Sequence, residues 1–151
     1  MFTKSRRLGN RRVQMWALHN PQTLHRRQLR GLKRRPAAWL GDNITIPGTW
    51  DCVTPVPSTS PFAHSFAEQV SRKLNLPLKP LLTKQQPLAM SRIPVAFRRR
   101  KSRGLMRSTP APARVLLVDD YITTGSTVLA AARALLRNGA SRVGAIAWRI
   151  A

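Results

Sequence analysis

The chain has 151 residues, enough for one domain with a buried core, and 27 lysines and arginines against five acidic residues give it a net charge of +22. The single cysteine, Cys52, excludes an intramolecular disulfide and a cysteine-clustered zinc site. No apolar run approaches membrane-spanning length, so we expect no membrane insertion. A chain without disulfides suits a reducing compartment, and we predict a cytoplasmic location. An acid-free, arginine-rich N-terminus is also typical of a eukaryotic transit peptide, and the sequence leaves this alternative open.

Residues 1–50 are predicted to form a basic N-terminal extension with one or two amphipathic helices. Val13, Trp16 and Ala17 recur at a spacing that places them on one helical face. We expect Trp16 to dock such a helix onto the rest of the protein. A tryptophan among arginines is also typical of a surface that binds single-stranded nucleic acid.

Two further elements follow this extension. Residues 51–57 predict a strand that ends in a proline-rich turn, because proline cannot donate to a strand ladder. Residues 62–74 predict a helix, since Phe66, Val70 and Leu74 recur every four residues and form a core-facing stripe. The basic segment at residues 83–112 is too long for a tight connection and predicts a mobile or functional loop.

The most informative segment begins with residues 115–118, an apolar run that predicts a strand buried on both faces of a parallel sheet. Asp119 and Asp120 follow at its carboxyl end, where open α/β sheets bind their ligands. A hydroxyl-rich loop then leads into a predicted helix, and a helix N-terminus with such a loop binds phosphate well. The predicted phosphate-binding residues are Thr123, Thr124, Gly125, Ser126 and Thr127. Ser126 or Thr127 is equally suited to be an ordinary N-cap.

Two carboxylates beside a phosphate loop predict a particular kind of ligand. Ionised carboxylate oxygens accept strong hydrogen bonds from hydroxyl groups, and the loop would hold a phosphate. A ribose 5-phosphate has both features, with vicinal hydroxyls near a phosphate at one end.

The remaining elements complete an α/β pattern. An apolar stripe after the loop predicts a helix that Gly139 would end, and residues 142–148 predict a final parallel strand. A strand, helix and strand of this length form the right-handed crossover of parallel sheets. We therefore predict an α/β fold with a parallel sheet flanked by helices.

The segment Val-Leu-Leu-Val-Asp-Asp-Tyr-Ile-Thr-Thr-Gly-Ser-Thr, residues 115–127, resembles the phosphoribosyl pyrophosphate (PRPP) motif of type I phosphoribosyltransferases. The resemblance implies a phosphoribosyltransferase-like domain at residues 51–151 that binds PRPP or a ribose 5-phosphate nucleotide. It implies that Asp119 and Asp120 are the catalytic residues and hold the ribose hydroxyls. It also implies Mg²⁺ as cofactor, although no metal ligand is directly assignable. Tyr121 stands where small aliphatic residues are usual.

A second segment, Asp-Cys-Val-Thr-Pro-Val-Pro at residues 51–57, is similar to the start of the core in the competence protein F family, which is associated with bacterial DNA uptake. In that family the next loop meets pyrophosphate, and Arg-Gly-Phe-Asn begins the helix. Here residues 58–61 lack a basic side chain and His64-Ser65-Phe66-Ala67 replaces that stretch. A later loop, where Gln85, Ser91 and Arg92 loosely resemble the family pattern, is the other source of cations. Whether the chain catalyses a transfer is therefore left open.

The extreme charge supports a non-enzymatic alternative, a protein that binds single-stranded DNA or another polyanion. The N-terminal arginines and one basic cluster would contact the phosphates, and the cluster consists of Arg98, Arg99, Arg100, Lys101 and Arg103. A regulator that senses PRPP with the same pocket is a further alternative.

Overall fold

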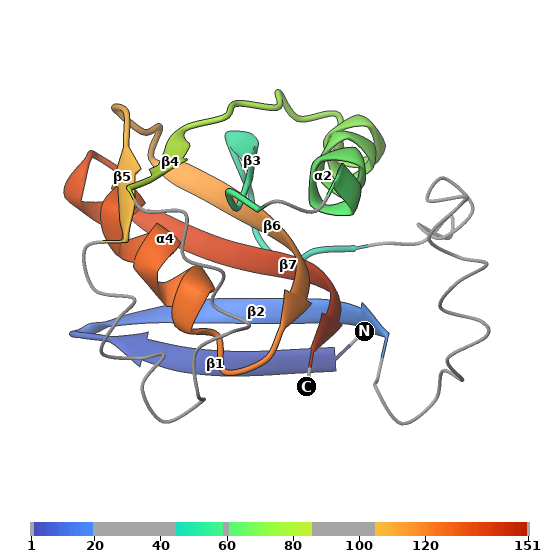
Figure 1. Cartoon of the computed structure of the whole chain (residues 1–151), viewed down its shortest axis with the longest axis horizontal. Coiled ribbons are helices and arrows are strands. Elements are labelled where there is room, and N and C mark those ends of the chain that lie inside the picture. The colour runs from blue at the N-terminus through green and yellow to red at the C-terminus, as the bar shows by residue number, and fades with distance from the viewer. Residues whose placement is uncertain (1, 20–44, 59–60, 86–104, 151) are drawn as a thin grey trace.

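The computed structural model describes residues 2–19, 45–58, 61–85 and 105–150. Its main sheet has five strands in the order β1-β2-β7-β6-β3 (Figure 1). The strands are β1 (Phe2–Leu8), β2 (Arg11–His19), β3 (Cys52–Pro55), β6 (Arg114–Ile122) and β7 (Arg142–Ile150). The β2, β7, β6 and β3 strands run parallel, and β1 is antiparallel to β2. The predicted α/β fold with a mainly parallel sheet is confirmed.

Two helices flank this sheet on opposite faces. The α2 helix (Pro61–Leu74) packs against β3 and β6, whereas α4 (Ser126–Arg137) packs against the other face (Figure 1). A second, two-stranded antiparallel sheet of β4 (Leu82–Lys84) and β5 (Met106–Ser108) lies beside α4. Neither α2 nor α4, the helices of the described residues, has the length and apolarity of a membrane span.

Alternation along the strands divides the apolar side chains between two cores, one on each face of the sheet. The core under α4 includes Val13, Met15, Val115, Leu117 and Leu135. The core under α2 includes Trp16, Phe66, Leu116, Ile146 and Trp148. Strands buried on both faces carry continuous apolar runs, which explains why residues 115–118 lack polar alternation.

The predicted helix around Val13, Trp16 and Ala17 is wrong, because these residues belong to β2. Val13, Met15 and Ala17 point to the core under α4, while Trp16 points to the opposite core. This strand is buried on both faces, so its apolar residues form a run whose spacing also fits a helix. Strands from both sides of the boundary predicted after residue 50 belong to one sheet, because β1 and β2 precede this boundary and β3, β6 and β7 follow it. Residues 20–44 lie outside the described part of the chain.

Residues 83–112 were expected to form one long loop, but β4 and β5 lie near the two ends of this range and pair with each other, and residues 86–104 lie outside the described part of the chain. The remaining predicted elements are confirmed. The strand and helix expected after residue 50 are β3 and α2, and the strand expected at residues 142–148 is β7. Gly139 follows α4 with a φ of 111°, a left-handed conformation that suits glycine at a helix end. Cys52 is fully buried in β3, and burial raises the pKa of its thiol.

The absence of a side chain at Gly144, in the central strand β7, allows two tryptophan rings to cover the sheet. A Cβ built there would lie 2.5 Å from Cη2 of Trp50 and 2.8 Å from Cζ3 of Trp16. The two rings pack edge to face with their centroids 6.0 Å apart. The guanidinium carbon of Arg142 lies over the Trp50 ring, 4.9 Å from its centroid. Gly144 is therefore required for the packing of this face rather than for an unusual backbone angle.

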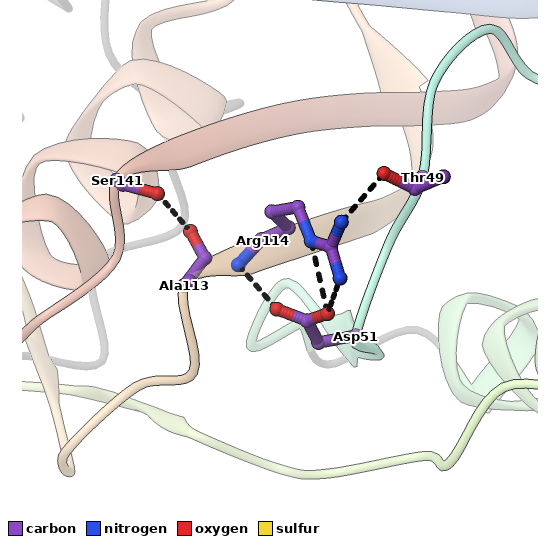
Figure 2. A network of polar contacts seen from close by, with 5 residues as sticks. All are labelled: Thr49, Asp51, Ala113, Arg114 and Ser141. Carbon is purple, nitrogen blue, oxygen red and sulfur yellow. Dashed lines mark hydrogen bonds and ion pairs between the residues drawn. The ribbon is translucent and has the colours of Figure 1, made fainter.

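A polar network joins the starts of β3 and β6 at the edge of the sheet opposite the acidic pair (Figure 2). Asp51 accepts hydrogen bonds from the backbone N–H of Arg114 at 2.8 Å and from its Nε at 3.0 Å. Arg114 also donates to Oγ1 of Thr49 at 2.7 Å. These hydrogen bonds lower the pKa of Asp51 and fix the relative position of the two strands.

We predict that Gly144→Ala lowers the free energy of unfolding by about 1–3 kcal/mol, because the new methyl group overlaps both tryptophan rings. Urea denaturation measures this loss. Trp50→Leu in the same chain should recover part of it, since the smaller side chain vacates the overlapping volume. Strictly additive losses in the double variant would contradict this packing.

Candidate functional site

The acidic pair lies near the carboxyl end of β6, as the sequence predicted. Asp119 is buried, with 6% of its surface exposed, whereas Asp120 is half-buried. The carboxylate of Asp119 accepts a hydrogen bond from the N–H of Asp120 at 2.9 Å, and Asp120 accepts one from the N–H of Tyr121 at 2.8 Å. The two carboxyl groups therefore differ, because only Asp120 is open to a ligand in solvent.

Burial raises the pKa of Asp119 from 3.8 to about 8, and the neighbouring carboxylate of Asp120 adds to the effect. The Asp119 carboxyl is thus protonated at neutral pH and donates as well as accepts hydrogen bonds. Both groups were expected to be ionised acceptors, and the structure distinguishes them. A cation brought in by a ligand would favour the ionised form.

The predicted phosphate-binding residues form a bend between β6 and α4. Gly125 adopts a φ of 75°, a left-handed conformation that other residues rarely adopt. A Cβ built on Gly125 would lie 3.4 Å from the sulfur of Met15, a β2 residue that lies beneath the loop. The β2 strand therefore supports the loop, a role that sequence patterns gave no reason to expect.

The N-terminus of α4 is capped by Gly125, and no side chain makes the capping hydrogen bond. Neither Ser126 nor Thr127 is the N-cap. The hydroxyl of Thr124 lies 2.9 Å from that of Ser126 and accepts the N–H of Ser126 at 3.3 Å. The first hydrogen bond of the helix runs from the N–H of Leu129 to the carbonyl of Gly125, at 2.8 Å. The N–H groups of residues 126–128 therefore have no acceptor within the helix. Together with the helix dipole, these N–H groups and hydroxyls can receive an anion.

Lys84, at the end of β4, is a lysine whose charge acts on the acidic pair. Its positive charge lowers the pKa of Asp119, although burial outweighs this effect. The N–H of the next residue, Gln85, donates to the carbonyl of Leu105 at 2.9 Å and fixes the end of β4. No sequence pattern singled out Lys84, because only the packing of the β4–β5 sheet beside α4 brings it near β6.

The segment expected to meet pyrophosphate contributes little charge within the described residues. His64 is exposed on α2, with Nε2 at 3.4 Å from Oε1 of Glu68, and Arg72 contacts the same carboxylate at 3.5 Å. Phe66 points into the core. These contacts favour a structural role for His64. Residues 59–60 lie outside the described part of the chain.

The basic cluster at Arg98, Arg99, Arg100, Lys101 and Arg103 also lies outside the described residues, as do Ser91 and Arg92. Predictions that depend on them stay predictions.

The residues near Asp120 fit Mg²⁺ only with help from a ligand. In the described ranges no group of three or more histidine, cysteine or acidic side chains could enclose a metal ion. Mg²⁺ is usually held by one or two carboxylates together with substrate phosphates and water. Asp120, half-buried at the strand end, is suited to this partial role, whereas a protonated Asp119 is a poor ligand.

We predict that stability falls as pH rises from about 5 to 7, because folded Asp119 keeps a proton that the unfolded chain releases. One proton gives a slope of about 1.4 kcal/mol per pH unit, which ends near the folded pKa of about 8. Urea denaturation at several pH values measures the slope, and Asp119→Asn should remove it. A difference between wild type and variant that stays constant with pH would exclude the raised pKa.

Comparison with known proteins gives three results. No curated protein matches the chain. One solved structure that resembles it is TT1426 from Thermus thermophilus, with 18% identity, coverage of 79% of this chain and 83% of that chain, and a TM-score of 0.47.

The family model for the phosphoribosyl transferase domain matches residues 32–148. The match includes the acidic pair, the phosphate loop and α4, and it leaves out β1 and β2. The chain therefore belongs to the phosphoribosyltransferase domain family.

Proposed function

We propose that this chain binds PRPP or a ribose 5-phosphate nucleotide at the carboxyl end of β6 and transfers the phosphoribosyl group. One observation carries the proposal: a half-buried carboxylate, Asp120, lies near the end of β6, three residues before a loop that leads into a helix N-terminus whose N-cap, Gly125, has no side chain. Family membership supports it independently.

The proposed roles follow from the chemistry of each group. The N–H groups and hydroxyls of residues 123–127 bind the 5′-phosphate, and Asp120 accepts hydrogen bonds from the ribose hydroxyls. Asp119 supports the ribose from within the sheet, as donor or acceptor according to its proton. Lys84 and the basic loop that follows it supply positive charge for the pyrophosphate that leaves C1. Mg²⁺, when bound with the ligand, would neutralise part of the developing charge.

We also propose that the chain is related to competence protein F and acts in DNA uptake in the cytoplasm. The support is the sequence of residues 51–57, which forms β3 and its proline turn ahead of α2. A buried, unpaired Cys52 is compatible with a reducing compartment.

We predict that the protein binds PRPP in the presence of Mg²⁺ and that Asp119→Ala with Asp120→Ala weakens binding by roughly 100-fold or more. Two hydrogen bonds to a charged or polar site account for a loss of this size. Isothermal titration calorimetry measures the affinity, with a nucleoside monophosphate as a second ligand. The absence of binding by either ligand would overturn the ribose 5-phosphate site.

Asp51→Asn is the matched control, because it also removes an acidic charge, but Asp51 binds Arg114 at the start of β6 (Figure 2), whereas the acidic pair lies near the end of that strand. It should leave PRPP affinity within about twofold of wild type. Release of pyrophosphate with a suitable acceptor would establish transfer. If the protein binds PRPP but releases no pyrophosphate, the result would instead favour a regulator that senses PRPP.

A second candidate function, nucleic-acid binding, rests on the β1–β2 hairpin. Arg7 and Arg12 are exposed and directly opposite each other, and Arg6 is exposed beside them. Like charges in opposite positions destabilise a hairpin, and a polyanion would relieve that repulsion. Arg11 has another role, since it donates to the carbonyls of Ala140 and Ser141 at 3.2 and 3.1 Å.

We predict that Arg7→Gln with Arg12→Gln weakens binding to single-stranded DNA and makes the negative slope of log K against log salt shallower by about 1.4, the value for two phosphate contacts. Fluorescence anisotropy measures both. The control is Arg72→Gln with Lys73→Gln, which removes the same charge from exposed positions on α2. Equal effects of the two pairs would exclude the hairpin as a site.

The acidic-pair variant separates the two candidate functions. It should leave DNA affinity unchanged or raise it, because it removes negative charge away from the hairpin. A footprint at one DNA sequence would favour the regulator, whereas binding that depends on salt and ignores sequence would count against it.

A further inference from the structure

The strands β1, β2, β7 and β6 are neighbours in the main sheet (Figure 1), and each carries an arginine at the edge where the parallel strands begin. In strand order these are Arg7, Arg12, Arg142 and Arg114, which we call the arginine ladder. The first two and the last two are direct partners in the sheet register. Gln14 of β2 pairs with Gly144 of β7. Arg12 and Arg142 each come two residues earlier, so the ladder also continues from β2 to β7.

All four side chains of the ladder are exposed and belong to one face of the sheet, the face that carries the core under α2. Leu116 of this core comes two residues after Arg114, and Arg142 contacts Trp50 of the same core. Directly paired residues point to the same face, so the rest of the ladder follows. Because neighbouring strands lie about 4.8 Å apart, the ladder is a row of positive charge roughly 14 Å long.

Neutral groups hold the guanidinium of Arg142 in place. Its carbon lies 4.9 Å from the centroid of the Trp50 ring, a cation–π contact that leaves the positive charge uncompensated. A Cβ built on Gly48 would lie 2.7 Å from Nη2 of Arg142, so this glycine leaves room for the group. Nearby, Arg11 donates to two backbone carbonyls just before β7, which are also neutral. A cation fixed by neutral partners stays available to an anion and loses less entropy on binding than a mobile one.

One acidic side chain in the described part of the chain contacts the ladder. Asp51 forms an ion pair with Arg114, whose guanidinium also donates to Thr49 (Figure 2). Like charges in directly opposite positions destabilise a sheet, so the ladder costs stability in the free protein. A bound chain of negative charges would remove this repulsion. The row of cations with an acid at one end therefore indicates a polyanion as the ligand.

A single nucleic-acid strand has the shape and the charge that this row requires. It is a linear chain with one negative charge per nucleotide, and a stacked strand advances about 3.4 Å per nucleotide. Roughly four nucleotides would therefore span the ladder, and the long arginine side chains can adjust to their phosphates. A small anion would cover only part of the row.

We propose that the arginine ladder binds the phosphates of a single nucleic-acid strand that runs across β1, β2, β7 and β6. This proposal rests on the nucleic-acid binding proposed above for the β1–β2 hairpin, and it extends that site to Arg142 and Arg114. The ladder lies at the start of β6, whereas Asp120 comes six residues later on the same strand, about 20 Å away. The nucleic acid and a ribose 5-phosphate therefore occupy separate sites, at opposite ends of the parallel strands.

Arg142→Gln tests the part of the ladder that lies beyond the hairpin. Fluorescence anisotropy with a labelled oligothymidine of about twelve nucleotides, at several salt concentrations, measures the affinity and its salt dependence. At about 0.1 M salt the variant should bind roughly threefold to fivefold more weakly, and the negative salt slope should be shallower by about 0.7, the value for one phosphate contact. Arg107→Gln is the matched control, because it removes the same charge from an exposed position on β5.

Asp51→Asn should strengthen binding, a gain that a loss of folding would not produce. The change removes the negative charge that compensates Arg114, and it keeps a side-chain oxygen for the backbone N–H of that residue. The affinity for oligothymidine should rise by roughly threefold at about 0.1 M salt, and the salt slope should become steeper. An affinity that stays the same or falls would overturn the proposal, because Arg114 would then lie outside the site.

The same titrations separate the ladder from the hairpin site. If wild type does not bind oligothymidine, both proposals fail. If Arg7→Gln with Arg12→Gln weakens binding while Arg142→Gln behaves like Arg107→Gln, the hairpin binds DNA and the ladder proposal alone fails. Arg142→Lys keeps the charge and should retain the salt slope of wild type. A slope as shallow as that of Arg142→Gln would also overturn the ladder, because the charge would then not be the cause.

Discussion

The parallel pairing of β7 with a strand on each side is the constraint on which this structure depends. The β7 strand joins β2 to β6, so it connects the N-terminal hairpin to the strand that carries the acidic pair. Gly144 makes this arrangement possible, because its missing side chain leaves room for Trp16 and Trp50 over the sheet. Closing that face excludes water from one side of β6, while α4 covers the other. A strand covered on both sides can bury a carboxyl group near its end.

The burial that follows from this constraint gives the two carboxyl groups of the acidic pair different protonation and different access to solvent. Two adjacent residues of a strand point to opposite faces, so one carboxyl enters the core and its neighbour stays accessible. Asp119 consequently has a pKa of about 8, and Asp120 remains open to ligands. Lys84 and Met15, from segments distant in the chain, complete the surroundings by adding charge near Asp119 and support beneath Gly125. The candidate site is therefore a product of several elements, although its motif is a single short segment.

Local patterns predicted the parts of the fold in which one periodicity dominates. The stripe of Phe66, Val70 and Leu74 has no competing interpretation, and α2 forms where it was expected. The run at residues 115–118 matches β6 for the same reason. The prediction of an N-terminal helix was wrong because the spacing of Val13, Trp16 and Ala17 fits both a helical face and a strand buried on two sides. Only the pairing of β2 with β7 decides between them.

The sequence by itself determined the order of strand, acidic pair, glycine loop and helix, because these features depend on neighbouring residues and on backbone angles that Gly125 permits. It also determined the charge that attracts anions. The tertiary structure decided which carboxyl is protonated, that the charge of Lys84 acts on it, and that the guanidinium of Arg149 lies over the Tyr121 ring. These properties arise from burial and from contacts between strands far apart in the chain, and no local pattern encodes them.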